Sequence, residues 1–184
     1  MKSLSLNEFV EHQTFKGCLM LFLDFDDWNQ FTQYVNPDDV VENGIETDPH
    51  ISIIYGLRDY PTITTDIEKV LRKHKYESFQ DFYRTLKYQT FDISLFENEK
   101  YDVLKFGVNA APLHILRSII TSNFDYVTEF PDFVPHITIA YLKPGKGKSY
   151  LKKYRSLKID LFDSIKGSRL IYGDANYDET QILK

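Results

Sequence analysis

One short pattern that could carry out acid–base chemistry is written twice in the chain. Residues 49–55 read PHISIIY and residues 135–141 read PHITIAY, so each copy holds a histidine followed two positions later by a hydroxyl. Residues two apart on a β-strand point to the same face. We therefore expect His50 to share a surface with Ser52, and His136 with Thr138. The alternate positions (Ile51, Ile53 and Tyr55; Ile137, Ile139 and Tyr141) are expected to face the core.

Two imidazoles and two hydroxyls facing one another across a cleft suit the cleavage of a phosphodiester. A neutral histidine can accept the proton of an attacking hydroxyl or water, and a protonated one can donate to the leaving oxygen. Hydroxyls can donate to the non-bridging oxygens, where negative charge grows in the transition state. We predict His50, His136, Ser52 and Thr138 as catalytic, with Ser52 and Thr138 also binding the phosphate, and no metal or cofactor. A single such triplet would more often be structural, but two matched copies favour catalysis.

Apolar periodicity predicts the elements that must position these residues. Helices are expected over residues 28–35, 79–86 and 113–120, and a further helix is expected to begin at a capping box at 65–68. The first of these helices would be capped by Asp26 or Asp27 and would end before Pro37. Residues 36–49 are expected to form a loop. The expected strands cover residues 17–25, 50–55 (ending at Gly56), 90–95, 101–108, 136–142 and 157–162, with a last hairpin of 169–173 and 180–183.

The order strand, helix, loop, strand occurs twice. The first copy runs from Gly17 to His50 and the second from Tyr101 to His136, with similar offsets of 50 − 17 = 33 and 136 − 101 = 35 residues. Residues 1–184 are therefore predicted to form a single α+β domain of two pseudo-symmetric lobes. Antiparallel or mixed sheets would surround a central cleft, with the helices outside.

The composition limits the class of protein. The 184 residues are 42% hydrophobic and 27% charged, which is typical of a soluble globular protein. No apolar run is long enough to cross a membrane, and the first residues do not form a signal peptide. A single cysteine indicates a reducing compartment. The net charge of −5 argues against duplex nucleic acid as a partner but allows a small nucleotide. We expect a cytoplasmic monomer.

Two further residues are candidates for binding substrate. Lys143 begins a basic stretch, residues 143–158, that holds seven Lys and Arg residues and no acidic residue, directly after the second histidine segment. It could attract phosphates, although a solvated helix face would have the same composition. Phe15 precedes the first strand and could stack on a nucleobase.

The paired His50-Ile-Ser52 and His136-Ile-Thr138 motifs resemble those of the 2H phosphoesterase superfamily, which includes LigT-like 2′,5′-RNA ligases and 2′,3′-cyclic phosphodiesterases. Segments 17–21, 44–50, 96–103 and 135–141 are most similar to phage anti-CBASS nucleases, which destroy cyclic oligonucleotide signals such as cyclic GMP-AMP (cGAMP). One departure is Ser52, where that family commonly has threonine. A serine can still donate the hydrogen bond.

The resemblance implies a metal-independent phosphodiesterase that acts on the 3′–5′ bonds of cyclic di- or trinucleotides. A phage-encoded enzyme of this kind would work in the host cytoplasm and counter antiviral (CBASS) signalling. It also implies that His50 and His136 are the acid–base pair and that Ser52 and Thr138 bind the phosphate. Which histidine is the base stays open. The alternatives are an RNA-end-processing 2′,3′-cyclic phosphodiesterase or ligase-like enzyme, and a non-catalytic protein that sequesters the nucleotide.

Overall fold

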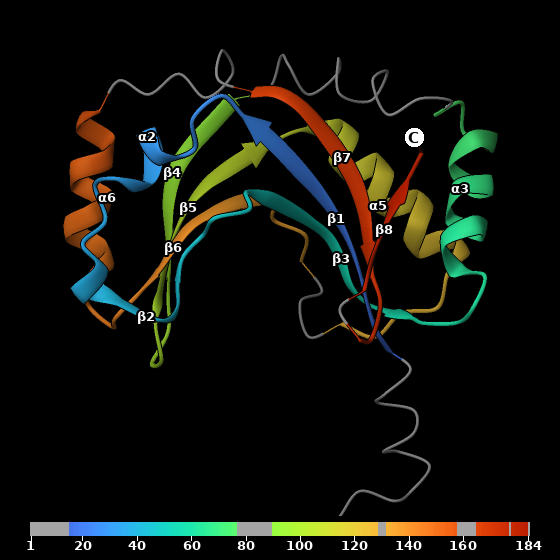
Figure 1. The fold of residues 1–184 in the computed structure, drawn as a ribbon, viewed down its shortest axis with the longest axis horizontal. Helices are drawn as coiled ribbons and strands as arrows, with labels where there is room; N and C mark the ends of the chain where they lie inside the picture. The colour runs from blue at the N-terminus through green and yellow to red at the C-terminus, as the bar shows by residue number, and fades with distance from the viewer. Residues whose placement is uncertain (1–14, 77–89, 129–131, 158–164, 177, 184) are drawn as a thin grey trace, which may run out of the picture.

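The computed structural model describes residues 15–76, 90–128, 132–157, 165–176 and 178–183. Two four-stranded antiparallel sheets form the two legs of an arch, and helices cover the outer side of each leg (Figure 1). The predicted α+β class with two sheets and outer helices is therefore confirmed. No helix in the described ranges is long and apolar enough to cross a bilayer.

The strands of each leg come from distant parts of the chain. The first sheet has the order β3 (His50–Arg58), β1 (Phe15–Phe25), β7 (Ile165–Gly173) and β8 (Glu179–Ile182). The second sheet has the order β2 (Val40–Ile45), β6 (His136–Leu142), β5 (Asp102–Asn109) and β4 (Thr90–Glu97). The predicted hairpin in the middle of the chain is the pair β4 and β5, and the predicted last hairpin is the pair β7 and β8.

Two helices each contact the sheet that does not contain the strand before them. Helix α2 (Asn29–Thr32) follows β1, yet its Phe31 ring meets Phe106 of β5 edge to face, with ring centroids 5.8 Å apart. Helix α5 (Ala111–Asn123) follows β5, yet its Arg117 donates to the carbonyl of Ile53 in β3 at 2.9 Å. These crossings tie the legs together. Helix α3 (Ile63–Lys73) lies beside α5, and α6 (Gly147–Ser156) lies on β4 and β5.

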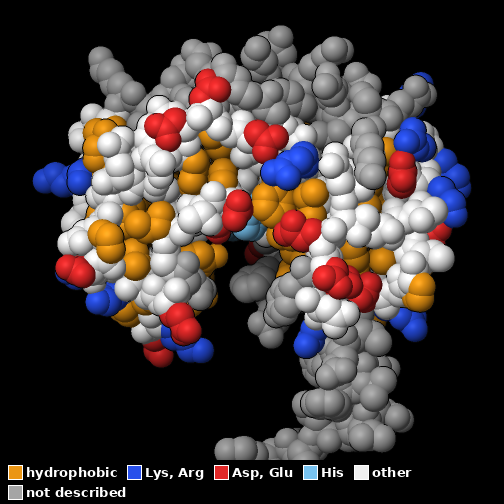
Figure 2. All heavy atoms as spheres, viewed as in Figure 1, with side chains coloured by type: hydrophobic (Ala, Val, Ile, Leu, Met, Phe, Trp, Pro, Cys, Tyr) orange, Lys and Arg blue, Asp and Glu red, His pale blue; other side chains and the backbone are white. Residues whose placement is uncertain are grey.

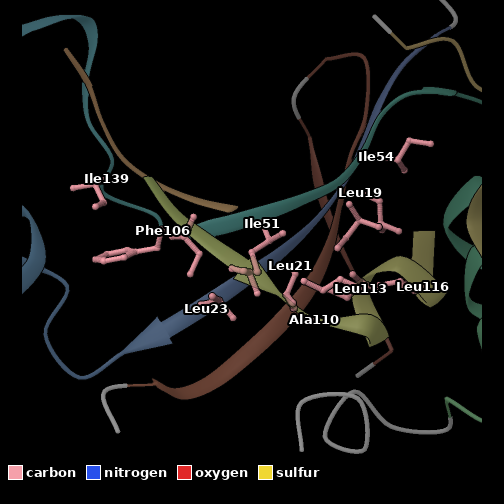
Figure 3. Packing of buried hydrophobic residues seen from close by; sticks show 14 of the residues in the cluster. Leu19, Leu21, Leu23, Ile51, Ile54, Phe106, Ala110, Leu113, Leu116 and Ile139 are labelled. Atoms are coloured by element: carbon pink, nitrogen blue, oxygen red, sulfur yellow. The ribbon is translucent and has the colours of Figure 1, made fainter. Parts of the chain in front are cut away.

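The core continues from one leg into the other. Leu19 and Leu21 of β1 pack with Leu113 and Leu116 of α5, while Phe106 belongs to the second sheet (Figure 3). The apolar stripe predicted for residues 113–120 is buried, and Pro112 lies in the first turn of the helix, where its missing N–H has no intrahelical acceptor to lose. This continuous core fixes where the inner edges of the two sheets meet.

The internal duplication predicted from the sequence is present in the strand pairing. Phe22 and Met20 of β1 face His50 and Ser52 of β3, while Gly107 and Lys105 of β5 face His136 and Thr138 of β6 in the same register. The proline before each histidine is anchored alike, because Leu23 N–H donates to the Pro49 carbonyl and Val108 N–H to the Pro135 carbonyl, both at 2.9 Å.

The prediction of a loop over residues 36–49 was wrong in its middle. A 3₁₀ turn, η1 (Pro37–Asp39), is followed by β2, which pairs with β6 only through Val40 opposite Leu142 and Ile45 opposite Ala140. Such an irregular edge strand needs no alternating apolar pattern, so its polar sequence gave no strand signal.

Several element boundaries also differ from the prediction, among them those of α3 and β3. Helix α3 begins at Ile63 with Thr62 as its N-cap residue, so the proposed capping box at 65–68 lies inside the helix. Strand β3 continues past Gly56, because Gly56 is an extra residue between the pairs Tyr55–Cys18 and Leu57–Gly17. The helix expected over 79–86 lies outside the described residues, as does nearly all of the strand expected over 157–162.

Gly56 allows the loop that leads to the second histidine to approach β3. It has φ of +89°, its carbonyl accepts from Val127 N–H at 2.8 Å, and a Cβ there would lie 1.8 Å from the Val127 carbonyl oxygen. We expect Gly56→Ala to lower the free energy of unfolding by more than the ~1–2 kcal/mol that a left-handed residue alone costs, measured by urea denaturation.

Gly145→Ala is the matched control for that prediction. Gly145 has φ of +82°, but nothing lies within 4 Å of its added Cβ. It should therefore show the conformational cost without the steric clash. Equal losses in the two variants would contradict the role assigned to the close approach at Gly56.

Candidate active site

The two histidine segments meet at the middle of the arch. Strands β3 and β6 belong to different sheets, yet their backbones lie side by side where the legs join (Figure 1). Viewed with all atoms, the molecule has a hollow between its legs, with a histidine side chain at the inner end (Figure 2). His50 and His136 are close enough for the charge of one to affect the pKa of the other.

Both histidines are held in the same tautomer. His50 Nδ1 lies 2.9 Å from the Asp48 carbonyl oxygen, and His136 Nδ1 lies 2.8 Å from the Val134 carbonyl oxygen. A carbonyl can only accept, so each Nδ1 must carry the hydrogen. Each Nε2 is then the atom that gains or loses a proton, which is the arrangement a general acid or base requires.

The surroundings of His136 favour its neutral form. Burial lowers the pKa of His136, and the positive charges of Lys105 and His50 lower it further, against a smaller raising effect of the hydrogen bond to the Val134 carbonyl. At neutral pH the Nε2 atom of His136 therefore carries a free lone pair. A neutral imidazole with a free lone pair can act as a proton acceptor.

The two hydroxyls lie on the same faces as their histidines but differ in environment. Ser52 is exposed, whereas Thr138 is only 8% exposed. Ser52 lies within hydrogen-bonding reach of the Cys18 thiol, whose pKa burial raises to about 12, so that the thiol stays protonated. Thr138 lies within reach of the Tyr141 hydroxyl. Each hydroxyl lies on the strand face that carries its histidine, and a hydroxyl has one hydrogen that it can donate to a bound anion.

The prediction that Tyr55 and Tyr141 face the core was wrong. Tyr55 is 53% exposed and Tyr141 is half-buried. Each strand contains one extra residue, Ile53 in β3 and Ile139 in β6, where the pairing register shifts. A bulge of this kind reverses the alternation beyond it. Each tyrosine is therefore turned to the face of the neighbouring hydroxyl.

A further described residue beside the histidine motif, which the sequence did not single out, is Lys105. It stands directly opposite Thr138 across β5 and β6, and Ser94 of β4 stands opposite Lys105 on its other side. Directly paired residues share a face, so the three form one polar row beside His136. The available signal was a single charged residue between Leu104 and Phe106 in an apolar strand.

The other two predicted binding residues are not brought to the histidines. Phe15 opens β1 and pairs with Arg58, at the opposite end of β3 from His50. Lys143 follows the last residue of β6, about 20 Å along the strand from His136. Its Nζ donates to the Asp38 carbonyl at 2.7 Å. Two other lysines of the basic stretch pair with carboxylates, Lys146 with Asp39 and Lys148 with Glu97.

In the described ranges, no group of three or more His, Cys, Asp or Glu side chains could hold a metal ion. The described groups at the centre of the arch include two imidazoles of fixed tautomer, the hydroxyls of Ser52 and Thr138, and the ammonium of Lys105. Such a set can move protons at a phosphate and bind its oxygens.

The fold matches that of solved structures of another protein. The structure is similar to that of Kluyveromyces marxianus Usb1, with a TM-score of 0.52 and 14% identity over 93% of this chain and 99% of that chain. Usb1 with uridine monophosphate matches with a TM-score of 0.55 and 13% identity, covering 94% of this chain and 99% of the other. No family model and no curated protein sequence matches.

Proposed function

We propose that this protein is a phosphodiesterase of the 2H type that cleaves 3′–5′ bonds in cyclic di- and trinucleotides. The observation that carries the proposal is the matched pair of histidines, each with Nδ1–H fixed by a backbone carbonyl and each beside a hydroxyl on its own strand. Binding alone does not require two titratable groups, which argues against a protein that only sequesters the nucleotide.

In the proposed reaction, His136 Nε2 takes the proton of the ribose 2′-hydroxyl. The 2′-oxygen forms a bond to phosphorus, the bond from phosphorus to the 5′-oxygen breaks, and protonated His50 donates its Nε2 proton to that oxygen. The product is one linear chain with a free 5′-hydroxyl at one end and a 2′,3′-cyclic phosphate at the other, which water can later open. Ser52 and Thr138 donate to the non-bridging oxygens. The favoured neutral form of His136 supports its assignment as the base.

The charge distribution supports a small substrate. The chain carries a net charge of −5, which repels long polyanions. Lys143, Lys146 and Lys148 form contacts with Asp38, Asp39 and Glu97 and do not line a continuous basic track. A compact nucleotide that meets the protein only at the centre of the arch fits this distribution better than extended RNA does.

A second candidate is the processing of linear RNA ends. It is favoured by the similarity to a Usb1 structure that contains a mononucleotide, uridine monophosphate. A linear nucleotide end could place its phosphate between the same two histidines. The two candidates share the chemistry and differ in the substrate.

The test is a substrate panel in the presence of EDTA, with products separated by chromatography. The panel holds 3′,3′-cyclic GMP-AMP, a cyclic trinucleotide, and a linear RNA ending in a 2′,3′-cyclic phosphate. We expect the cyclic compounds to be opened, because the paired histidines need no metal for proton transfer. Preference for the linear RNA would establish the second candidate. Recovery of intact cyclic ligand after denaturing its complex would identify a sequestering protein.

A further inference from the structure

Although the strand pairing repeats, the two halves of the site differ in polarity. On the face that carries Thr138, the row across β4, β5 and β6 reads Ser94, Lys105, Thr138. The equivalent row across β7, β1 and β3 reads Ile171, Met20, Ser52. A cation in one half therefore takes the position that a methionine has in the other, so the site is electrostatically one-sided.

Lys105 lacks a counter-ion in the described part of the chain. Its side chain is half-buried, and burial lowers the pKa of its ammonium with no carboxylate raising it. Asp92 lies in the adjacent row of β4, opposite Gly107, but no ion pair joins it to Lys105. A partly buried charge without a partner is costly unless an anion binds there.

We propose that Lys105 is the phosphate-binding cation of the site, and that its ammonium, flanked by Ser94 and Thr138, binds a non-bridging oxygen of the scissile phosphate. This inference rests on the proposed function and deepens it. The position beside His136 gives the lysine two effects, because the same charge that binds the phosphate also favours neutral His136, the form needed in a base. Because only one half of the pseudo-symmetric site carries this lysine, the substrate would bind in one orientation.

The first test compares the kinetics of Lys105→Met, Lys105→Arg and Lys148→Met on 3′,3′-cyclic GMP-AMP. Methionine keeps the apolar stem, and Lys148 is a matched control on the outer helix α6, with 77% of its side chain exposed. We expect kcat/KM to fall by about 10²–10³-fold in Lys105→Met. Lys105→Arg should stay within about tenfold of the wild type because it keeps the charge. Lys148→Met should match the wild type.

The pH profile separates a role in binding charge from a structural role. The described charged or titratable groups that face His136 are Lys105 on β5, His50 on β3 and Asp92 in the same row on β4. Removing the positive charge of Lys105 raises the pKa of His136. The acid limb of kcat/KM should therefore move to higher pH in Lys105→Met. The proposal would be overturned if Lys105→Met lost activity while the acid limb stayed at the same pH. It would also be overturned if folded Lys105→Met were as active as Lys148→Met.

A binding measurement keeps this inference distinct from the proposed function. In the His50→Ala background, where no cleavage is expected, calorimetry with 3′,3′-cyclic GMP-AMP should show a Kd at least about tenfold weaker when Lys105→Met is added. If the wild-type protein cleaves nothing but Lys105→Met still weakens ligand binding, the lysine site is supported and the phosphodiesterase function is rejected. Unchanged binding would reject the lysine site even if cleavage occurs.

Discussion

Replacing either His50 or His136 with alanine is expected to lower kcat for 3′,3′-cyclic GMP-AMP by about 10²–10⁴-fold while the fold survives. Each imidazole is half-buried at the surface and its ring contributes one backbone hydrogen bond, so little packing is lost. His136→Ala removes the base and His50→Ala removes the acid. Single-turnover kinetics on folded variants, checked by circular dichroism, would measure both effects.

His74→Ala is the matched control for these two variants, because His74 is exposed at the C-cap of α3, outside the paired motifs. It should retain wild-type activity. The double variant His50→Ala, His136→Ala should lose much less than the product of the two single losses, since groups that act on one step are not additive. Wild-type turnover by either folded single variant would rule out the paired mechanism.

Thr138→Val is expected to reduce kcat by about 10²–10³-fold, which is the usual cost of losing one donor to a developing oxyanion. Valine has nearly the shape of threonine, so the 8% exposed position stays filled. The Tyr141 hydroxyl loses its neighbour, which is expected to cost about 1 kcal/mol of stability. Steady-state kinetics and urea denaturation on the same preparation separate the two effects.

Two substitutions control for that result. Thr138→Ser keeps the hydroxyl and makes the second motif match the first, which has Ser52 in this position, so activity should remain within about tenfold of the wild type. Thr121→Val makes the same chemical change on α5, where the hydroxyl donates only within its own helix, to the Arg117 and Ser118 carbonyls. Equal losses in Thr138→Val and Thr121→Val would contradict the role of the Thr138 hydroxyl.

Strict alternation was sufficient for parts of the chain where strands pair without an extra residue. The hairpin of β4 and β5 pairs in continuous register from Thr90 opposite Asn109 to Glu97 opposite Asp102, as its period of two predicts. Alternation did not predict which side chains face the core where two apolar residues are adjacent in a strand. Ile53-Ile54 and Ile139-Ala140 fit either register equally well, and only pairing with β1 and β5 shows which residue is extra.

The sequence by itself determined the repeated motif, the α+β class and the sharing of a face by each histidine and its hydroxyl, because these depend on local spacing along a strand. The tertiary structure decided which residues from other strands join them. Lys105 reaches Thr138 through the register of β5 on β6, and the histidines approach each other where β3 meets β6 and where helices α2 and α5 tie the two sheets together. Contacts between segments far apart in the chain depend on packing, which no local pattern specifies.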